Sequence, residues 1–326
     1  MENFDLFSED MSSNRKADLN EVFDLAILGA GPAGLTASIY AGRAGLKFIL
    51  VERLSSGGQI VFSDQVDNYP GFPEGISGSQ LMERFEKQAS KFGTQIFSGE
   101  VREIKKSDNL FLIETSSGTI KSRSVIYAMG ADPMKLPVPE EERFRGKGVS
   151  YCATCDAAFF KDKIVCVVGG GDTALYDALH LSRFAKNVIV LHRRDKLRAV
   201  KVLQDIVKKN PRIELLLEHI PLHIIGNKKV EGLEVENVKT RESKVINIDG
   251  IFVAIGIVPN TLPLKGIVEL DEKGFIKTDL NMETSVQGLF AAGDVRATPL
   301  RQVVTAASDG AIAAFSAQKY LENLER

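Results

Sequence analysis

Short apolar runs, glycine-rich loops and helical patterns follow one another in a fixed order along much of the chain. An apolar run at 23–28 leads into a glycine-rich loop at 29–34, a helical pattern covers 33–42, and a second apolar run at 47–51 ends at Glu52. Strand, glycine loop, helix and strand in this order are typical of a βαβ unit, whose two strands are parallel. The first part of the chain is therefore predicted to form a parallel sheet.

The same order returns in the middle of the chain. A second glycine-rich loop at 169–174 begins 140 residues after the loop at 29–34, between apolar runs at 163–168 and 187–191. The chain is therefore predicted to contain two units of the same design. Two helices are expected, at 79–92 and at 174–184. Further strands are expected between 94 and 114 and at 124–127, 214–217, 223–225, 232–238 and 250–255.

Two segments that combine glycine and proline, at 128–133 and 254–260, mark where the chain enters and leaves the second unit. An alanine-rich helical pattern from 303 to 321 has no partner of its own, so it is assigned to the first unit. We predict an α/β fold with two Rossmann-like, three-layer (ββα) dinucleotide-binding domains, the second inserted into the first. The predicted ranges are 22–130 and 258–326 for the first domain, 131–257 for the second, and 1–21 for a mobile N-terminal extension.

The residue types in the first loop have mechanical reasons. Gly29 allows a tight turn, Gly31 lets the backbone approach a pyrophosphate, and Gly34 lets the helix and strand pack closely. The following helix offers free N–H groups and the positive end of its dipole to a phosphate. Glu52 is placed to accept a hydrogen bond from a ribose 2′-hydroxyl. The first domain is therefore predicted to bind a cofactor with a free 2′-hydroxyl, either FAD or NAD.

The second domain differs at the position of that acid. His192 stands there, and Arg193, Arg194 and Arg198 follow closely. An acid would repel a 2′-phosphate, whereas guanidinium groups bind it through bidentate, charge-assisted hydrogen bonds. The second domain is therefore predicted to bind NADP(H). The alternative, a solvated basic turn, does not account for the register of the repeat.

Composition narrows the class of protein. The chain has 326 residues, 44% of them hydrophobic, and its 41 basic and 43 acidic residues give a formal net charge of -2. This balance argues against a wide basic face for nucleic acid or an anionic membrane. No apolar stretch is long enough to span a bilayer, and the N-terminal residues lack the apolar run of a signal peptide. We expect a cytoplasmic protein with no nucleic-acid or membrane partner.

Between the two glycine loops lies a Cys-x-x-Cys segment, Cys152 and Cys155, followed directly by Asp156. A structural zinc site needs four ligands. Neither Cys166, within an apolar run, nor any of the four histidines supplies a second pair near the segment. A cytoplasmic location argues against a structural disulfide, so we predict a redox-active dithiol and no metal. Asp156 is placed to donate a proton to a departing thiolate or to flavin, and a helix N-cap is its alternative role.

These motifs together resemble the low-molecular-weight thioredoxin reductases, class II members of the FAD/NAD(P)-dependent pyridine nucleotide-disulfide oxidoreductase superfamily. The resemblance runs from about residue 22 to the end and is most specific at 152–156 (CATCD), shortly before the second glycine loop. It implies a homodimer with one FAD per chain. NADPH would reduce FAD, FAD would reduce the Cys152–Cys155 disulfide, and the dithiol would reduce thioredoxin. Cys155 would face the flavin, and which cysteine attacks the partner stays open.

The resemblance and the loop patterns assign residues to each site. The predicted FAD-binding residues are Gly29, Gly31, Pro32, Ala33, Gly34, Glu52, Arg53, Gly57, Gly58, Gln59, Asn68, Val101, Gly130, Asp294, Arg301, Gln302 and Val303. The predicted NADPH-binding residues are Gly169, Gly171, Asp172, Thr173, Ala174, His192, Arg193, Arg194, Arg198 and Gly256. By resemblance, Asp294 would bond the ribityl chain of FAD, and the segment 301–303 would contact the isoalloxazine ring. The predicted catalytic residues are Cys152, Cys155 and Asp156.

A few positions depart from the residues usual in that family. Met129 replaces Thr, Tyr176 and Asp177 replace a Glu pair, and Ile257 replaces His. None removes a group that the chemistry needs, although they bear on the affinity for pyridine nucleotide.

Two other functions stay open. One is an NAD(P)H-dependent flavoprotein reductase that delivers electrons to a different disulfide carrier or acceptor, such as a peroxiredoxin system or ferredoxin. The other is a non-catalytic flavin-binding redox sensor. The dithiol argues against delivery to acceptors such as ferredoxin, because a route from flavin to such an acceptor needs no dithiol.

Overall fold

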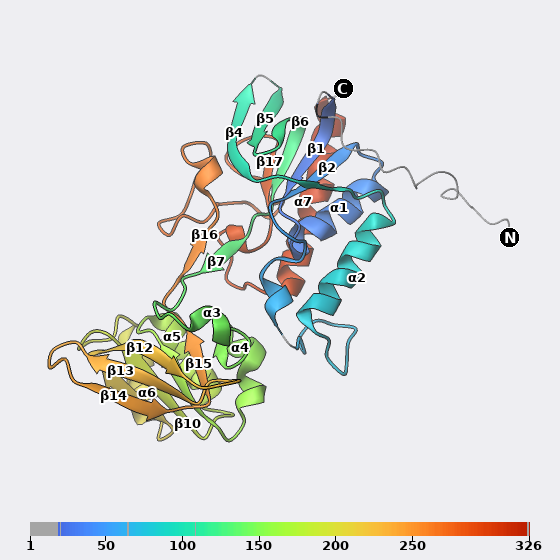
Figure 1. Cartoon of the computed structure of the whole chain (residues 1–326). Coiled ribbons are helices and arrows are strands. Elements are labelled where there is room, and N and C mark those ends of the chain that lie inside the picture. Colours follow the sequence, from blue (N-terminus) through green and yellow to red (C-terminus); the bar gives the residue numbers. More distant parts are fainter. Residues whose placement is uncertain (1–18, 20, 64, 108, 325) are drawn as a thin grey trace. The chain divides into compact units, whose positions relative to one another are not determined.

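The computed structural model describes residues 19, 21–63, 65–107, 109–324 and 326. Contacts divide the chain into two compact units (Figure 1), and the second interrupts the first in sequence. The first unit comprises Met1–Val61, Ser79–Ala131 and Pro259–Arg326, and the second Phe62–Gly78 and Asp132–Val258. Most of the N-terminal extension predicted at 1–21 lies outside the described residues.

One segment belongs to a different unit from the one the sequence indicated. Residues 62–78 were expected in the first domain, but their contacts place them in the second unit. There the guanidinium of Arg145 lies over the ring of Phe62, 4.5 Å from its centroid. Glycine and proline in this stretch predicted turns and gave no indication of which unit the turns contact.

A seven-stranded sheet forms the centre of the first unit. Its strands run in the order β3-β2-β1-β6-β5-β4, and β17 pairs with the second half of β6. The strands are β1 Val22–Leu28, β2 Phe48–Glu52, β3 Ile96–Ser98, β4 Val101–Ser107, β5 Leu110–Thr115, β6 Gly118–Tyr127 and β17 Leu289–Ala291. The pairs among β1, β2, β3, β6 and β17 are parallel, whereas β5 and β4 continue from β6 as an antiparallel meander. The carboxyl ends of β1, β2, β6 and β17 therefore meet at one edge.

Helices from both ends of the described chain cover this sheet. α1 (Pro32–Arg43) and α7 (Val303–Leu324) lie side by side, with α2 (Gly78–Ser90) next to α1 (Figure 1). The approach of α7 to α1 is closest at Gly310, where a Cβ atom would collide with the carbonyl oxygen of Ala33. The C-terminal helix thus packs directly on the helix that follows the first glycine loop.

The second unit contains a five-stranded, wholly parallel sheet in the order β11-β10-β9-β15-β8 and an antiparallel sheet, β12-β13-β14. The strands are β8 Val149–Ser150, β9 Ile164–Val168, β10 Asn187–His192, β11 Ile213–Leu217, β12 His219–Ile225, β13 Gly232–Asn237, β14 Ser243–Asn247 and β15 Gly250–Val253. The helices are α3 Glu141–Phe144, α4 Ala153–Asp156, α5 Asp172–Leu181 and α6 Lys201–Lys209.

Alternation along β9 shows how the layers pack in this unit. Val165 and Val167 belong to the buried cluster formed with α5 and α6. Cys166 and Val168 belong to the cluster formed with the antiparallel sheet. The parallel sheet is therefore the middle of three layers, and the predicted α/β class with Rossmann-like domains is confirmed.

Two short strands carry the chain between the units. β7 (Ala131–Pro133) pairs with β16 (Ile257–Pro259). The N–H of Asn260 donates to the oxygen of Gly130 at 3.1 Å, and the N–H of Met134 donates to the oxygen of Gly256 at 2.9 Å. Both glycines have a positive φ, 65° and 126°. The two connections are thus joined to each other at both ends.

Candidate functional site

The cysteines of the Cys-x-x-Cys segment form a disulfide, with 5.3 Å between the Cα atoms of Cys152 and Cys155. β8 ends at Ser150, Cys152 is the N-cap of α4, and Cys155 lies on that helix. Both cysteines are half-buried. The disulfide is therefore held by regular structure on both sides and stays partly accessible to a reactant.

A small hydrogen-bond network surrounds the disulfide. Ser150 Oγ donates to Asp156 Oδ2 at 2.5 Å and accepts the N–H of Cys152 at 3.1 Å. Thr154 Oγ1 lies 3.4 Å from Cys152 Sγ. Asp156 does occupy the N-cap of the short 3-10 helix η2 (Ala157–Phe160), but its side chain makes no capping hydrogen bond. The carboxylate thus points back to Ser150, a residue that sequence reasoning missed.

The dithiol and the second glycine loop lie at the same edge of the parallel sheet. β9 ends at Val168, directly before Gly169, β10 ends at His192, and β8 leads into Cys152, all at carboxyl ends of parallel strands. β15 alone separates β8 from β9. With neighbouring strands about 4.8 Å apart, the two segments start roughly 10 Å from each other. In open α/β sheets this edge is where ligands bind.

The second glycine loop has the backbone geometry that the sequence predicted. Gly169 has φ 155°, and a Cβ there would lie 2.8 Å from that of Ala174. No atom lies within 4 Å of the Cβ position of Gly171, the N-cap of α5. Thr173 is exposed at the start of this helix, and Asp172 Oδ1 accepts the N–H of Val200 at 2.8 Å. Open space in front of a helix N-terminus suits an anionic group.

His192 is buried beside this loop. The side chain is 6% exposed and lies against Gly170, where a Cβ would collide with the imidazole. Burial lowers the pKa of His192, a backbone hydrogen bond with Lys196 opposes this shift, and the positive charges of the three nearby arginines lower the pKa further. Its Nε2 has no hydrogen-bond partner among the described residues. Such a buried, unsatisfied nitrogen indicates a missing ligand atom or water.

The arginines that follow His192 are all exposed in this part of the second unit. The backbone N–H of Arg198 donates to the oxygen of Gly170 at 2.7 Å, which holds the basic segment against the glycine loop. Arg193 and Arg194 start this segment directly after β10. The predicted NADPH-binding residues therefore gather at one edge, and Gly256 follows β15 at the same edge.

The first glycine loop is shaped by close backbone contacts. Gly29 has φ 102°, and a Cβ there would collide with the oxygen of Ala128. A Cβ at Gly34 would collide with the oxygen of Gly29, whereas Gly31 has no atom within 4 Å of its Cβ position. Pro32, at the first position of α1, and the buried Ala33 continue the loop into the helix. The turn, the tight packing and the open approach that the three glycines predicted are all present.

Glu52 connects β2 to this loop. Its Oε2 accepts the N–H of Ala30 at 2.8 Å, and its Oε1 accepts the N–H groups of Arg53 and Leu54 at 2.8 and 2.9 Å. Each carboxylate oxygen has two lone pairs, so Oε1 is fully used by its two N–H groups, whereas Oε2 can still accept one bond from a ligand hydroxyl. The exposed Arg53 is paired with Glu100 at 3.6 Å.

The remaining candidate residues of the first unit differ in how near they lie to the loop. The N–H of Gly57 donates to the oxygen of Ala30 at 2.8 Å, which brings Gly58 and Gln59 beside it at the start of η1 (Gly58–Phe62). Val101 is buried at the start of β4, and Gly130 follows β6. Asn68 is assigned by its contacts to the second unit, and its place along the flavin stays a prediction.

The last group follows β17 at the carboxyl edge. Burial raises the pKa of Asp294, on the short 3-10 helix η4 (Gly293–Val295), to about 6. Arg301 donates to the backbone oxygen of Asp294 at 3.3 Å and lies 4.1 Å from the centroid of the Phe275 ring. Val303 begins α7, and the N–H of Gln302, directly before the helix, donates to the hydroxyl of Thr305 at 3.1 Å.

A buried ion pair that the sequence did not reveal supports this group. Arg296 Nε lies 2.6 Å from Asp309 Oδ2, and the two side chains are only 15% and 10% exposed. Asp309 Oδ2 also accepts the N–H of Gly293 at 3.1 Å. The pair ties the segment that carries Asp294 to α7. Arginine and aspartate occur widely on protein surfaces, so their sequence positions gave no signal.

Cys166 takes no part in the dithiol site. It is 0% exposed and lies on the face of β9 that packs against the antiparallel sheet, as the apolar run indicated. Burial raises the pKa of its thiol to about 12. Among the described residues, no cluster of His, Cys, Asp and Glu could hold a metal ion, and no helix is long and apolar enough to cross a membrane.

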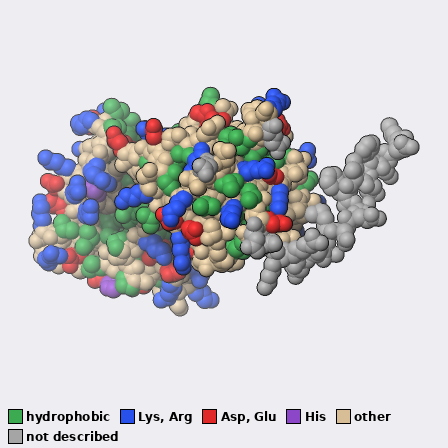
Figure 2. Space-filling model, turned by 90° about the horizontal axis from the view of Figure 1, so that it is seen from above, with side chains coloured by type: hydrophobic (Ala, Val, Ile, Leu, Met, Phe, Trp, Pro, Cys, Tyr) green, Lys and Arg blue, Asp and Glu red, His purple; other side chains and the backbone are tan. Residues whose placement is uncertain are grey.

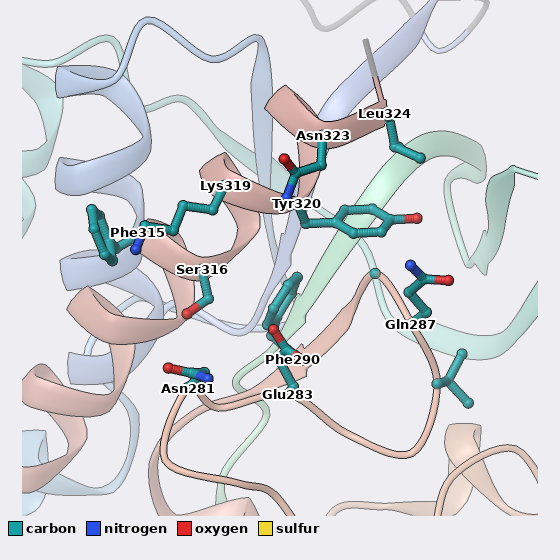
Figure 3. A pocket seen from close by; sticks show the side chains of 12 residues that line it. Asn281, Glu283, Gln287, Phe290, Phe315, Ser316, Lys319, Tyr320, Asn323 and Leu324 are labelled. Atoms are coloured by element: carbon teal, nitrogen blue, oxygen red, sulfur yellow. The ribbon is translucent and has the colours of Figure 1, made fainter. Parts of the chain in front are cut away.

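A separate hollow of about 400 Å³ lies in the first unit between the end of α7 and the segment before β17 (Figure 3). Phe290 and Tyr320 form its wall, and Lys319 and Glu283 lie on opposite sides of it. No predicted site residue lines it.

Basic and acidic side chains are interspersed on the face in Figure 2, so that face carries no single-sign patch for nucleic acid.

Comparisons with known proteins agree with this geometry. The family model described as pyridine nucleotide-disulphide oxidoreductase matches residues 23–310. The chain is 45% identical over 310 residues to a thioredoxin reductase of Peptoclostridium acidaminophilum, covering 93% of this chain and 98% of that protein. It is 46% identical over 303 residues to one of Treponema pallidum, covering 93% and 98%. The crystal structure of thioredoxin reductase from Streptococcus pyogenes superposes with a TM-score of 0.89 at 40% identity, covering 93% of this chain and 99% of that one.

Proposed function

This chain belongs to the pyridine nucleotide-disulphide oxidoreductase family, and we propose that it is a thioredoxin-disulfide reductase that uses FAD and NADPH. The observation that carries the proposal is the Cys152–Cys155 disulfide, which follows β8 at the carboxyl edge of the second sheet, with Asp156 beside it. A partly exposed dithiol that can exchange with a protein disulfide is the feature this activity needs. The thioredoxin reductases to which the chain is similar cover nearly all of it.

The first unit has a donor and acceptor set that fits FAD. The open space at Gly31, in front of the N-terminus of α1, would take the pyrophosphate. Glu52, fixed by three backbone N–H groups, would bind the ribose. Asp294 and the segment 301–303 would hold the flavin half, since they follow β17 at the same carboxyl edge as the loop. Asn68, which contacts assign to the second unit, stays among the predicted FAD-binding residues.

The second unit fits NADPH for a different reason. His192 presents a buried nitrogen with no partner among the described residues, next to a glycine loop with open space at Gly171. Arg193, Arg194 and Arg198 expose guanidinium groups beside it and would bind the 2′-phosphate. A ligand with both a pyrophosphate and a 2′-phosphate would meet both features.

FAD that NADPH has reduced supplies the two electrons that open the Cys152–Cys155 disulfide. The residues of the chain carry out the exchange that follows. One cysteine thiolate attacks a sulfur of the thioredoxin disulfide, so that a mixed disulfide forms and the other thioredoxin sulfur leaves as a thiolate. Asp156 donates a proton to the departing sulfur and regains one from solvent. The second cysteine then attacks the mixed disulfide, which restores the Cys152–Cys155 bond and releases reduced thioredoxin.

Serine substitutions test the proposal. Cys152→Ser and Cys155→Ser should each abolish thioredoxin reduction, because a cyclic disulfide needs both sulfurs. FAD should stay bound, since neither cysteine belongs to the first unit. NADPH oxidation with ferricyanide, which takes electrons from the flavin, should persist in both variants. The control is Cys166→Ala, which removes a thiol from the core and should leave turnover unchanged. Retention of most thioredoxin activity in either serine variant would contradict the dithiol mechanism.

The proposal extends to assembly and location. We expect a homodimer with one FAD per chain and a cytoplasmic site of action, where thiols are kept reduced and a dithiol carrier can turn over. Sedimentation of the FAD-loaded protein measures the first expectation directly. A monomer with full turnover would contradict the expected homodimer and would not bear on the proposed chemistry.

A further inference from the structure

Ser150 is a buried hydroxyl at the edge where the chemistry takes place. The residue is 6% exposed and is the last of β8, directly before the Tyr151–Cys152 segment. Its Oγ donates to Asp156 Oδ2 at 2.5 Å and, at the longer distance of 3.4 Å, to the oxygen of Cys152, and it accepts the N–H of Cys152 at 3.1 Å. It therefore bridges the carboxylate and the backbone of the first cysteine.

The strand end that carries Ser150 is itself anchored. Tyr151, which alternates to the other side of the strand, donates to Glu141 Oε1 at 2.7 Å and accepts the N–H of Leu136 at 3.3 Å. β8 is paired in parallel with β15 at Val149 and Ser150. The hydroxyl of Ser150 thus starts from a fixed backbone, which is what a group that orients another side chain requires.

The disulfide bond is one of the links between Cys152 and α4, and catalysis breaks it in every cycle. Links that do not involve sulfur include the backbone bonds from Cys155 and Asp156 to the oxygen of Cys152, at 3.3 and 3.1 Å, and the bridge through Ser150. The bridge acts directly on the carboxyl group of Asp156, while the two backbone bonds hold its helix.

We propose that Ser150 is a positioning residue, which holds the carboxyl group of Asp156 in place against the Cys152 backbone when the disulfide is open. The inference rests on the proposed function, in which Asp156 protonates the sulfur that leaves. In that step the S–S bond of the substrate breaks, its electron pair goes to the departing sulfur, and the proton moves from Asp156 to that sulfur. Without Ser150 the carboxyl group loses a 2.5 Å hydrogen bond that ties it to the Cys152 backbone.

The test compares two substitutions in the FAD-loaded protein. Ser150→Ala should lower thioredoxin turnover roughly 10-fold or more, because a well-placed general acid contributes about 10²- to 10⁴-fold. Ser150→Thr keeps the hydroxyl and should restore most of that turnover. NADPH oxidation with ferricyanide should be unchanged in both. The matched control is Ser182→Ala, which removes an equally buried hydroxyl from the same unit, one bonded to Leu179 and Asn210.

A pH profile separates positioning from a loss of stability. The acid is identified by the limb of the profile of thioredoxin turnover against pH that disappears in Asp156→Asn. In Ser150→Ala the same limb should move to higher pH, because the hydrogen bond that Ser150 donates favours the ionised carboxylate. An unmoved limb, or a Ser150→Thr variant as slow as Ser150→Ala, would overturn the inference.

One readout does not depend on thioredoxin. The pH dependence of alkylation of the reduced dithiol by iodoacetamide should shift in Ser150→Ala in the same direction as in Asp156→Asn, and should not shift in Ser182→Ala. No shift in Ser150→Ala would overturn the inference. A wild-type protein inactive with thioredoxin would count against the proposed function alone.

Discussion

The exposed arginines after β10 set the expected choice of nucleotide. Arg193→Ala should weaken NADPH binding by about 1.5–3 kcal/mol, or roughly 10- to 100-fold, because one bidentate contact to the 2′-phosphate is lost. NADH lacks that phosphate, so its Michaelis constant should barely change. Arg183→Ala, at the far end of α5, is the matched control and should affect neither nucleotide. Equal Michaelis constants for NADPH and NADH in the wild type would refute the assignment of this site.

Asp177, one of the departures from the family's usual residues, predicts a pH effect on stability. Burial raises the pKa of this carboxyl on α5 to about 6. The unfolded value is near 4, so the folded state holds the extra proton between about pH 4 and 6. The stability associated with that proton is present below about pH 4 and is lost as the pH rises through 6.

Asp177→Asn should therefore stabilise the second unit at pH 7 by about 1–2 kcal/mol, and the gain should vanish near pH 4. Melting temperatures at both pH values measure this. Asp205→Asn is the control, because a hydrogen bond from Lys201 lowers the pKa of that exposed carboxyl. A gain of the same size at both pH values would show that the effect is not ionisation.

At the scale of elements, α7 holds the segment after β17 through one buried ion pair. Asp309→Asn should cost about 3–5 kcal/mol, because it leaves the Arg296 guanidinium buried without its counter-charge. It should also loosen Gly293 and the neighbouring Asp294, and so lower the FAD content of purified protein. Glu322→Gln, an exposed change on the same helix, is the control. Full FAD retention and an unchanged melting temperature in Asp309→Asn would contradict this role.

The elements also show why some parts of the fold could be predicted from the sequence and others could not. Both glycine loops could be predicted, because a glycine is required wherever a Cβ would collide, as at Gly29 and Gly34. The sequence predicted only residues 124–127 of β6, because the buried positions of this strand before residue 124 include a serine. The hydroxyls of Ser122 and Ser124 donate to backbone oxygens, both at 2.7 Å, which lets polar residues occupy a core strand.

The residues of the candidate site also divide into those that could be predicted from the sequence and those that could not. The cysteines and Asp156 could be named from their spacing, since a dithiol is a local motif. Ser150 could not, because its role depends on the distance between its hydroxyl and a carboxylate six positions further on. The pair Arg296 and Asp309 is formed by the fold in the same manner, between a loop and a helix. Contacts that the fold creates leave no periodic pattern in the sequence.

For the whole molecule, each unit places most of its candidate residues at the carboxyl edge of its parallel strands, with Val101 at the start of β4 as an exception. The FAD residues lie in the first unit, apart from Asn68, whereas the NADPH residues and the dithiol lie in the second. Neither unit alone holds the full set of groups that carry electrons from NADPH to a protein disulfide. The central claim is therefore about the intact chain, and it requires NADPH oxidation to be coupled to thiol formation.

The most direct test is an anaerobic stoichiometry. FAD-loaded protein is mixed with limiting NADPH and an excess of oxidised thioredoxin, and the thiols formed on thioredoxin are counted. We expect two thioredoxin thiols for each NADPH consumed, and negligible NADPH oxidation when thioredoxin is left out. NADPH consumption without a matching yield of thiols would contradict this expectation, and would point to an acceptor that takes electrons from the flavin without the dithiol.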